Sequence, residues 1–170
     1  MVKSKFVGLF AACVAMFGLF ASVAEAQMSV GGLTRTGAGA AQTLSTSAAK
    51  LDAFTAALPS TTTDGDQSVV ASVADDNVAV VAGGVYVIRF SYSGTADATT
   101  AITYTIRDGS TAITGATATI NHVASTGMSG SIDTVYRPTS TGAISVYAVA
   151  ASGTPAITAV SSNLVIMRIK

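Results

Sequence analysis

Apolar and polar positions alternate in short runs from residue 68 to the end of the chain, with turn residues between the runs. The clearest run is 85–92, where four large side chains fall on one face because successive side chains of a strand point to opposite sides. These four are Tyr86, Ile88, Phe90 and Tyr92. Further runs are predicted at 69–73, 78–81, 102–106, 116–123, 130–136, 143–149 and 156–170.

Turn residues separate these runs where strands would have to reverse. Asp75-Asp76-Asn77 lies between the first two runs, and Gly83-Gly84 precedes the run at 85–92. Asp108-Gly109 is a pair suited to a tight hairpin. The spacing of roughly ten residues predicts an all-β fold, an antiparallel jelly roll or β-sandwich of about 8–10 strands.

The segment 46–58 has two interpretations. Leu51, Phe54 and Leu58 are at helical spacing, and Pro59 would end a helix. The same residues could form a first edge strand, and the local pattern leaves both open. The preceding residues, 27–47, are mostly Gly, Ala, Ser and Thr, which predicts an extended arm or linker before a domain at 48–170.

The first 26 residues have the pattern of a secretory signal peptide. Lys3 and Lys5 precede an apolar run at 6–23, and Ala24-Glu25-Ala26 supplies small residues at positions −3 and −1 of a cleavage site. The mature protein is therefore expected to be secreted, or displayed on a cell or virion surface, with no membrane contact after cleavage. An uncleaved anchor is the alternative, because the run is long enough to span a bilayer.

Charge and cysteine content narrow the class of protein. Without Lys3, Lys5 and Glu25, the nine cationic and nine anionic residues of the chain leave a net charge of about −1. A neutral surface rich in Ser and Thr lacks the basic patch of a nucleic-acid binder. The single cysteine, Cys13, lies within the leader. Lipidation of Cys13 is disfavoured by the bulky Phe10 three residues earlier. The domain must therefore be stabilised by its core or by association.

The segment Gly84-Val85-Tyr86-Val87-Ile88-Arg89-Phe90 resembles the core of the C1q/TNF-like signature, Gly-x-Tyr-x-Phe-x-aromatic. Ile88 departs from it, and Asp66 matches an upstream Asn/Asp position. The upstream aromatic positions of the signature hold Ser60, Ala71 and Val78. The acidic turn before the Gly-Gly pair and the closing strand at 164–169 are similar to bacterial and phage-borne members of this group. The resemblance covers about residues 48–170.

This resemblance implies a jelly roll that assembles as a homotrimer. Carried onto this chain, it makes Tyr86 a candidate residue of the oligomer core near the three-fold axis, with Phe90 and Tyr104 as neighbours. The alternative is that all three belong to the ordinary core of the sandwich.

Catalytic machinery is not evident from the residues. His122 is the only histidine and is expected at a strand end or on the surface, and no Gly-x-Ser-x-Gly elbow accompanies it. An enzyme and a required cofactor are therefore not expected. Calcium is the one cofactor worth weighing, with Asp64, Asp66, Asp75 and Asp76 as weak candidate ligands. Aspartates are also ordinary turn residues.

Two functional hypotheses follow. The first is a secreted, non-enzymatic attachment or structural module, a trimeric C1q/TNF-like head that binds a glycan, a polymer or a protein. The second is a subunit of an extracellular filament or coat, in which the arm at 27–47 inserts as a strand into a neighbouring subunit.

Overall fold

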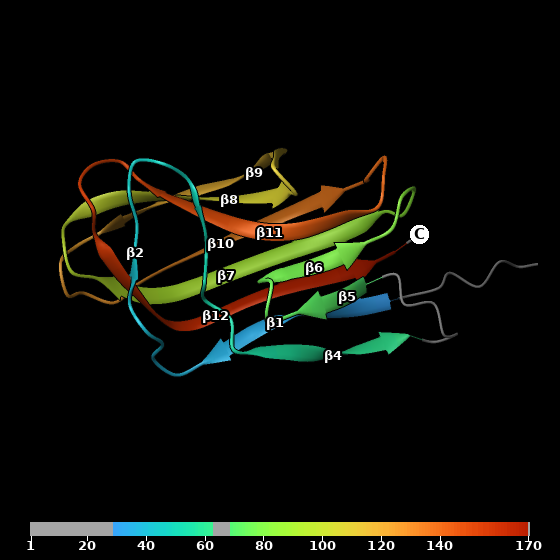
Figure 1. Cartoon of the computed structure of the whole chain (residues 1–170), viewed down its shortest axis with the longest axis horizontal. Coiled ribbons are helices and arrows are strands. Elements are labelled where there is room, and N and C mark those ends of the chain that lie inside the picture. The colour runs from blue at the N-terminus through green and yellow to red at the C-terminus, as the bar shows by residue number, and fades with distance from the viewer. Residues whose placement is uncertain (1–28, 63–68, 170) are drawn as a thin grey trace, which may run out of the picture.

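The computed structural model describes residues 29–62 and 69–169, which form two antiparallel β-sheets packed as a sandwich (Figure 1). Sheet A has the order β10 (Met128–Tyr136), β7 (Tyr86–Ala96), β12 (Ala156–Arg168), β1 (Ser29–Thr36) and β4 (Ala56–Thr62), with β2 (Gln42–Thr43) paired to β12. Sheet B has the order β5 (Val69–Ser72), β6 (Asn77–Val80), β11 (Gly142–Ala150), β8 (Thr100–Asp108) and β9 (Thr111–His122), with β3 (Ala49–Lys50) paired to β11.

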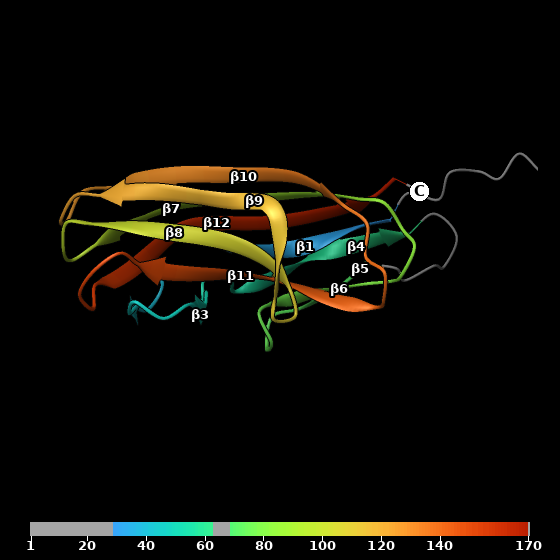
Figure 2. The ribbon, with the colours of Figure 1, turned by 90° about the horizontal axis from the view of Figure 1, so that it is seen from above.

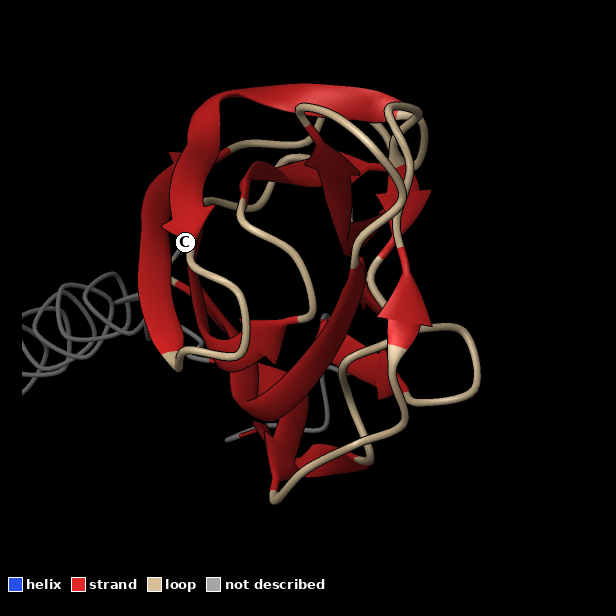
Figure 3. Cartoon of the chain, turned by 90° about the vertical axis from the view of Figure 1, so that its left-hand side faces the viewer, coloured by secondary structure: helices blue, strands red, loops and turns tan. Residues whose placement is uncertain are grey.

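The chain passes repeatedly from one sheet to the other, which is the connectivity of a jelly roll. After β4 it crosses to β5 and β6, returns for β7, crosses to β8 and β9, and then alternates through β10, β11 and β12. Seen from one end, the strands of both sheets surround a common interior (Figure 3). The all-β jelly-roll prediction is confirmed. In the described part of the chain, no helix is long and apolar enough to cross a bilayer.

The core is filled by the alternating faces that the sequence pattern predicts. Tyr86, Ile88 and Phe90 of β7 are at most 1% exposed, and they face the other sheet across the interior. Ile102, Tyr104 and Ile106 of β8 are fully buried. The eight predicted strands between 69 and 168 all form, because period-two alternation is a local property of the chain that survives packing.

The prediction of an extended arm at 27–47 is wrong for residues 29–36, which form β1. This strand lies inside sheet A and is paired with β12 on one side and with β4 on the other. Leu33 is fully buried. The small residues signify close packing here, since a Cβ on Gly31 would lie 2.9 Å from Val69 Cγ1. A strand whose two edges are already paired in its own chain is not a free donor for a neighbouring subunit.

Farther along the same predicted arm, Leu44 is 1% exposed, so this stretch too contributes to the core. The ambiguous segment 46–58 forms no helix. Leu51 and Phe54 are buried in an irregular stretch between β3 and β4, and the edge-strand alternative holds for β4, which ends one side of sheet A. Leu51 and Phe54 are therefore buried by contacts with the rest of the fold and not as the apolar face of a helix.

The predicted turns lie where expected. Asp108 and Thr111 are the last paired residues of the β8–β9 hairpin, and Gly109 between them has φ +56°. The β5–β6 hairpin turns through residues 73–76. Its last residue, Asp76, has φ +44°, a conformation in which aspartate and asparagine are tolerated better than most residues.

Candidate functional site

The three candidates for the oligomer core lie inside the single chain. Tyr86 and Tyr104 are fully buried and Phe90 is 1% exposed. The Tyr86 hydroxyl donates to the carbonyl oxygen of Val81 (3.2 Å) and accepts from its N–H (3.1 Å). Side chains with no exposed area have nothing left to bury against a second copy. Of the two interpretations from the sequence, the geometry fits the ordinary sandwich core.

A buried polar cluster surrounds Tyr104. Its ring centre lies 5.0 Å from that of Tyr92, and its hydroxyl is 3.3 Å from His122 Nε2. His122 ends β9, as expected, but it is 1% exposed and so is not a surface residue. Burial lowers the pKa of His122 and raises that of Tyr104. The imidazole of His122 therefore lies in the core, away from the protein surface.

Only two of the four calcium candidates, Asp75 and Asp76, lie within the described residues. Asp64 and Asp66 lie outside those residues, so their prediction stays untested. Asp75 accepts a hydrogen bond from the Ser72 hydroxyl (2.8 Å), and Asp76 Oδ1 is buried with no hydrogen-bond partner. Residues 29–62 and 69–169 contain no group of three His, Cys, Asp or Glu side chains arranged to hold a metal ion.

Asp76 should make stability depend on pH. Burial, reinforced by the nearby charge of Asp52, raises the pKa of Asp76 from 3.8 to about 6. Below pH 3.8 the carboxyl is protonated in both the folded and the unfolded protein, so stability is highest there, and it falls as the pH rises through 6 because folding then buries a charge. We expect Asp76→Asn to raise the melting temperature by about 2–4 °C above pH 6 and by almost nothing at pH 4.

Thermal melting of the two proteins from pH 4 to pH 8 measures this difference. Asp75→Asn is the matched control, because it removes the same charge from the adjacent, exposed turn residue. A melting-temperature difference for Asp76→Asn that is equal at pH 4 and pH 8 would contradict the assignment of the effect to ionisation.

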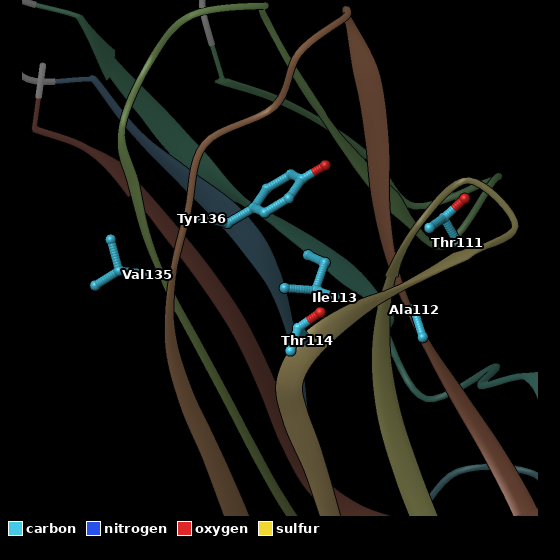
Figure 4. Close-up of a pocket in the computed structure, with 6 residues that line it drawn as sticks. All are labelled: Thr111, Ala112, Ile113, Thr114, Val135 and Tyr136. Atoms are coloured by element: carbon cyan, nitrogen blue, oxygen red, sulfur yellow. The ribbon is translucent and has the colours of Figure 1, made fainter.

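A pocket of about 340 Å³ opens between β9 and β10 (Figure 4). These two strands are the edges of different sheets and lie side by side (Figure 2). They pack closely at Gly130, where a Cβ would lie 2.6 Å from Ile120 Cδ1. The β9–β10 pocket lies nearer the β8–β9 turn and is lined by Thr111, Ala112, Ile113, Thr114, Val135 and Tyr136.

A large bulge in β9 shapes this pocket. Pairing between β8 and β9 jumps from Thr105↔Thr117 to Arg107↔Ala112, so residues 113–116 lie opposite Ile106 alone. Gly115 within the bulge has φ +77°, which favours glycine. Ile113 turns inward and is 6% exposed, whereas Thr114 stays exposed. The bulge therefore places an aliphatic side chain and a hydroxyl beside each other in the pocket.

Tyr136 is held in place by a carboxylate outside the set of lining residues. Its hydroxyl donates to Asp108 Oδ2 (2.8 Å), and Asp108 Oδ1 accepts from the N–H of Ala143 (3.0 Å). Burial and the Asp108 carboxylate raise the pKa of Tyr136 to about 12, so its ring stays neutral at physiological pH. Sequence reasoning missed both this pair and the pocket. The only signal of the pocket in the sequence was Gly115, because a glycine near the start of a strand pattern can indicate a bulge.

A second depression, of about 380 Å³, lies on the surface of sheet A across β10, β7 and β12. Five serines contribute to its lining, together with Tyr92 and Gly130; they are Ser91, Ser93, Ser129, Ser131 and Ser161. This depression is more open and flatter than the β9–β10 pocket. The outward-facing positions of its strands are serines, so no aromatic ring projects into it.

The strand order and the pairing of the two sheets are those of a jelly roll, and a comparison with solved structures supports a TNF-like jelly-roll fold. Among solved structures, murine APRIL at pH 5.0, a TNF-family protein, is similar with a TM-score of 0.54. The match covers 84% of this chain and 98% of the APRIL chain at 11% sequence identity. At this identity the likeness concerns the fold alone. No protein-family model and no curated protein matches the sequence.

Proposed function

We propose that this chain is an extracellular, non-enzymatic attachment module that works as a homotrimeric TNF-like head. Its predicted leader supports export, and its jelly-roll fold supports a compact binding head. The burial of its only histidine among tyrosines supports a role without acid–base catalysis. Glycans, polymers and proteins are the ligand classes considered for such a head.

The proposal of self-association rests on the outward face of sheet A. At one end of this face, side chains from four neighbouring strands form an apolar row: Val135, Val87, Met167 and Val30. Val135 is 65% exposed and the other three are partly exposed. Exposed apolar side chains that line up across strands gain free energy when a second surface covers them.

The remainder of the same face is polar but has little net charge. Arg89 and Asp133 are neighbours there and pair at 2.6 Å. Beyond this pair, the rows contain Ser91, Asn163 and Thr34, and then further serines, none of them charged. A flat face with one neutralised ion pair supports association between identical copies, which normally closes into a symmetric ring or dimer.

The oligomeric state tests this proposal directly. Light scattering after size exclusion of residues 27–170 is expected to give three times the chain mass. Val87→Asp should reduce the mass to that of one chain, because the new carboxylate would have to be buried in the interface. Val149→Asp makes the same change on the outward face of sheet B, at a residue of similar exposure, and should leave the trimer intact.

Other outcomes contradict the proposal. A monomeric wild-type protein would eliminate the trimer, and loss of the trimer with both variants would show that the face of sheet A is not special. Open-ended polymers would favour the filament alternative, although β1 would then have to leave its own sheet, where both of its edges are paired.

A further inference from the structure

The β9–β10 pocket combines features that point to one class of ligand. None of its six lining residues carries a charge at neutral pH, given the neutral ring of Tyr136. A charged ligand would leave water there without a compensating partner, at a large cost. The neighbouring carboxylate of Asp108 repels an anionic ligand, and its oxygens are already engaged by the Tyr136 hydroxyl and the N–H of Ala143. The pocket therefore favours a neutral ligand.

The surfaces of the pocket are of two kinds. The Tyr136 ring forms one wall, and Ile113 and Ala112 add aliphatic surface (Figure 4). Thr111 and Thr114 present exposed hydroxyls that have no hydrogen-bond partner among the described side chains and backbone. A purely apolar ligand would leave these hydroxyls unused, whereas a purely polar ligand would gain nothing from the ring and the aliphatic floor.

The Tyr136 ring is preorganised for this role. Its hydrogen bond to Asp108 fixes the ring before a ligand binds, so little side-chain entropy remains to be lost on binding. The phenolic oxygen still has a lone pair with which to accept a hydrogen bond. A rigid aromatic face with nearby hydroxyls is suited to a saturated ring that has C–H groups on its faces and hydroxyls at its edge.

We propose that the β9–β10 pocket binds a neutral saccharide ring, stacked on Tyr136 and hydrogen-bonded by Thr111 and Thr114. The volume of about 340 Å³ is at the small end of ligand pockets and suits a mono- or disaccharide. This inference rests on the proposed function, because it specifies the glycan that the attachment module would bind. It excludes uronic acids and sugar phosphates as preferred ligands.

Saturation-transfer NMR on residues 27–170 tests the proposal with defined probes. The methyl glycosides of glucose, galactose, mannose and N-acetylglucosamine are added at about 10 mM, a concentration at which a site with a millimolar Kd is mostly occupied. Cellobiose, lactose and maltotriose form the second arm and report whether a terminal ring or a ring within a chain is bound. Glucuronate is the charged comparison. We expect at least one neutral sugar to give signal and glucuronate to give none.

Two matched variants locate the binding. Thr114→Val keeps the branched shape but removes one hydroxyl, and it should weaken binding of the responding sugar about 2- to 12-fold. Thr117→Val makes the identical change at another exposed residue of β9, outside the pocket, and should leave affinity unchanged. Thr111→Val is a second pocket variant, used if Thr114→Val lowers the melting temperature. Both positions are exposed, so the fold is expected to persist.

The outcomes separate this inference from the trimer. A trimer that gives no signal with any neutral sugar, or that prefers glucuronate, would overturn the saccharide site alone. Equal losses of affinity for Thr114→Val and Thr117→Val would also overturn it. Sugar binding by a monomeric protein would confirm the site and reject the trimer. Val135 is left unchanged throughout because it belongs both to the pocket and to the apolar row of sheet A.

Discussion

Replacing Gly32 with alanine is expected to lower the free energy of unfolding by about 3 kcal/mol. An added Cβ would lie 2.2 Å from the carbonyl oxygen of Leu164 and 3.1 Å from Val165 Cα. These are main-chain atoms of β12, which is paired with β1 on one side and with β7 on the other. A backbone held by two neighbouring strands cannot move aside without breaking hydrogen bonds, so the clash is not relieved cheaply.

Urea unfolding measures this loss, and Gly127→Ala is the matched control. No atom lies within 4 Å of a Cβ at Gly127, and the change there should alter the free energy of unfolding by less than about 0.5 kcal/mol. If Gly32→Ala were as stable as wild type, β1 would not be packed against β12, and the interpretation of residues 27–47 as a free arm would be restored.

Truncating Tyr104 is expected to have an effect at least as large. Tyr104→Ala should cost about 3–5 kcal/mol, because it opens a cavity at the centre of the sandwich. The ring contacts Tyr92 and Phe90, with centres 5.0 and 6.0 Å away. Tyr104→Phe keeps this packing and removes the hydroxyl that lies 3.3 Å from His122 Nε2, for a cost of about 1–2 kcal/mol.

Denaturant unfolding and light scattering together identify the role of Tyr104. Tyr147→Ala is the control at a partly exposed tyrosine of sheet B, whose ring packs against the Arg107 guanidinium, 4.6 Å from the ring centre. That change should cost no more than about 1 kcal/mol. If Tyr104→Phe left stability unchanged but lowered the oligomeric mass, Tyr104 would be an interface residue after all.

The candidate site was far less accessible to sequence reasoning than the fold. Asp108 was assigned to a turn, which is correct, but its bond to Tyr136 joins residues 28 positions apart on strands of different sheets. The lining of the pocket depends on a bulge that sets four residues of β9 against one of β8. Register shifts of this kind follow from packing, and the alternation of residue types does not encode them.

Composition misled the interpretation of the N-terminal segment for a physical reason. Gly31 and Gly32 have no side chains with which to signal burial, yet their value to the fold is that they allow Val69 and the backbone of β12 to approach. The small side chains of residues 27–47 were interpreted as unable to contribute to a core. In this chain it marks a strand that is paired on both edges and closely packed.

The sequence by itself determined the all-β class and the position of eight strands from 69 onward, because period-two alternation and turn residues act within a few positions. It also showed that Tyr86, Phe90 and their neighbours share a face. Only the tertiary structure decided that this face points into the chain's own core, that β1 completes sheet A, and that β9 and β10 part to form a pocket. Each of these depends on which distant strands become neighbours, and local patterns carry no information about that choice.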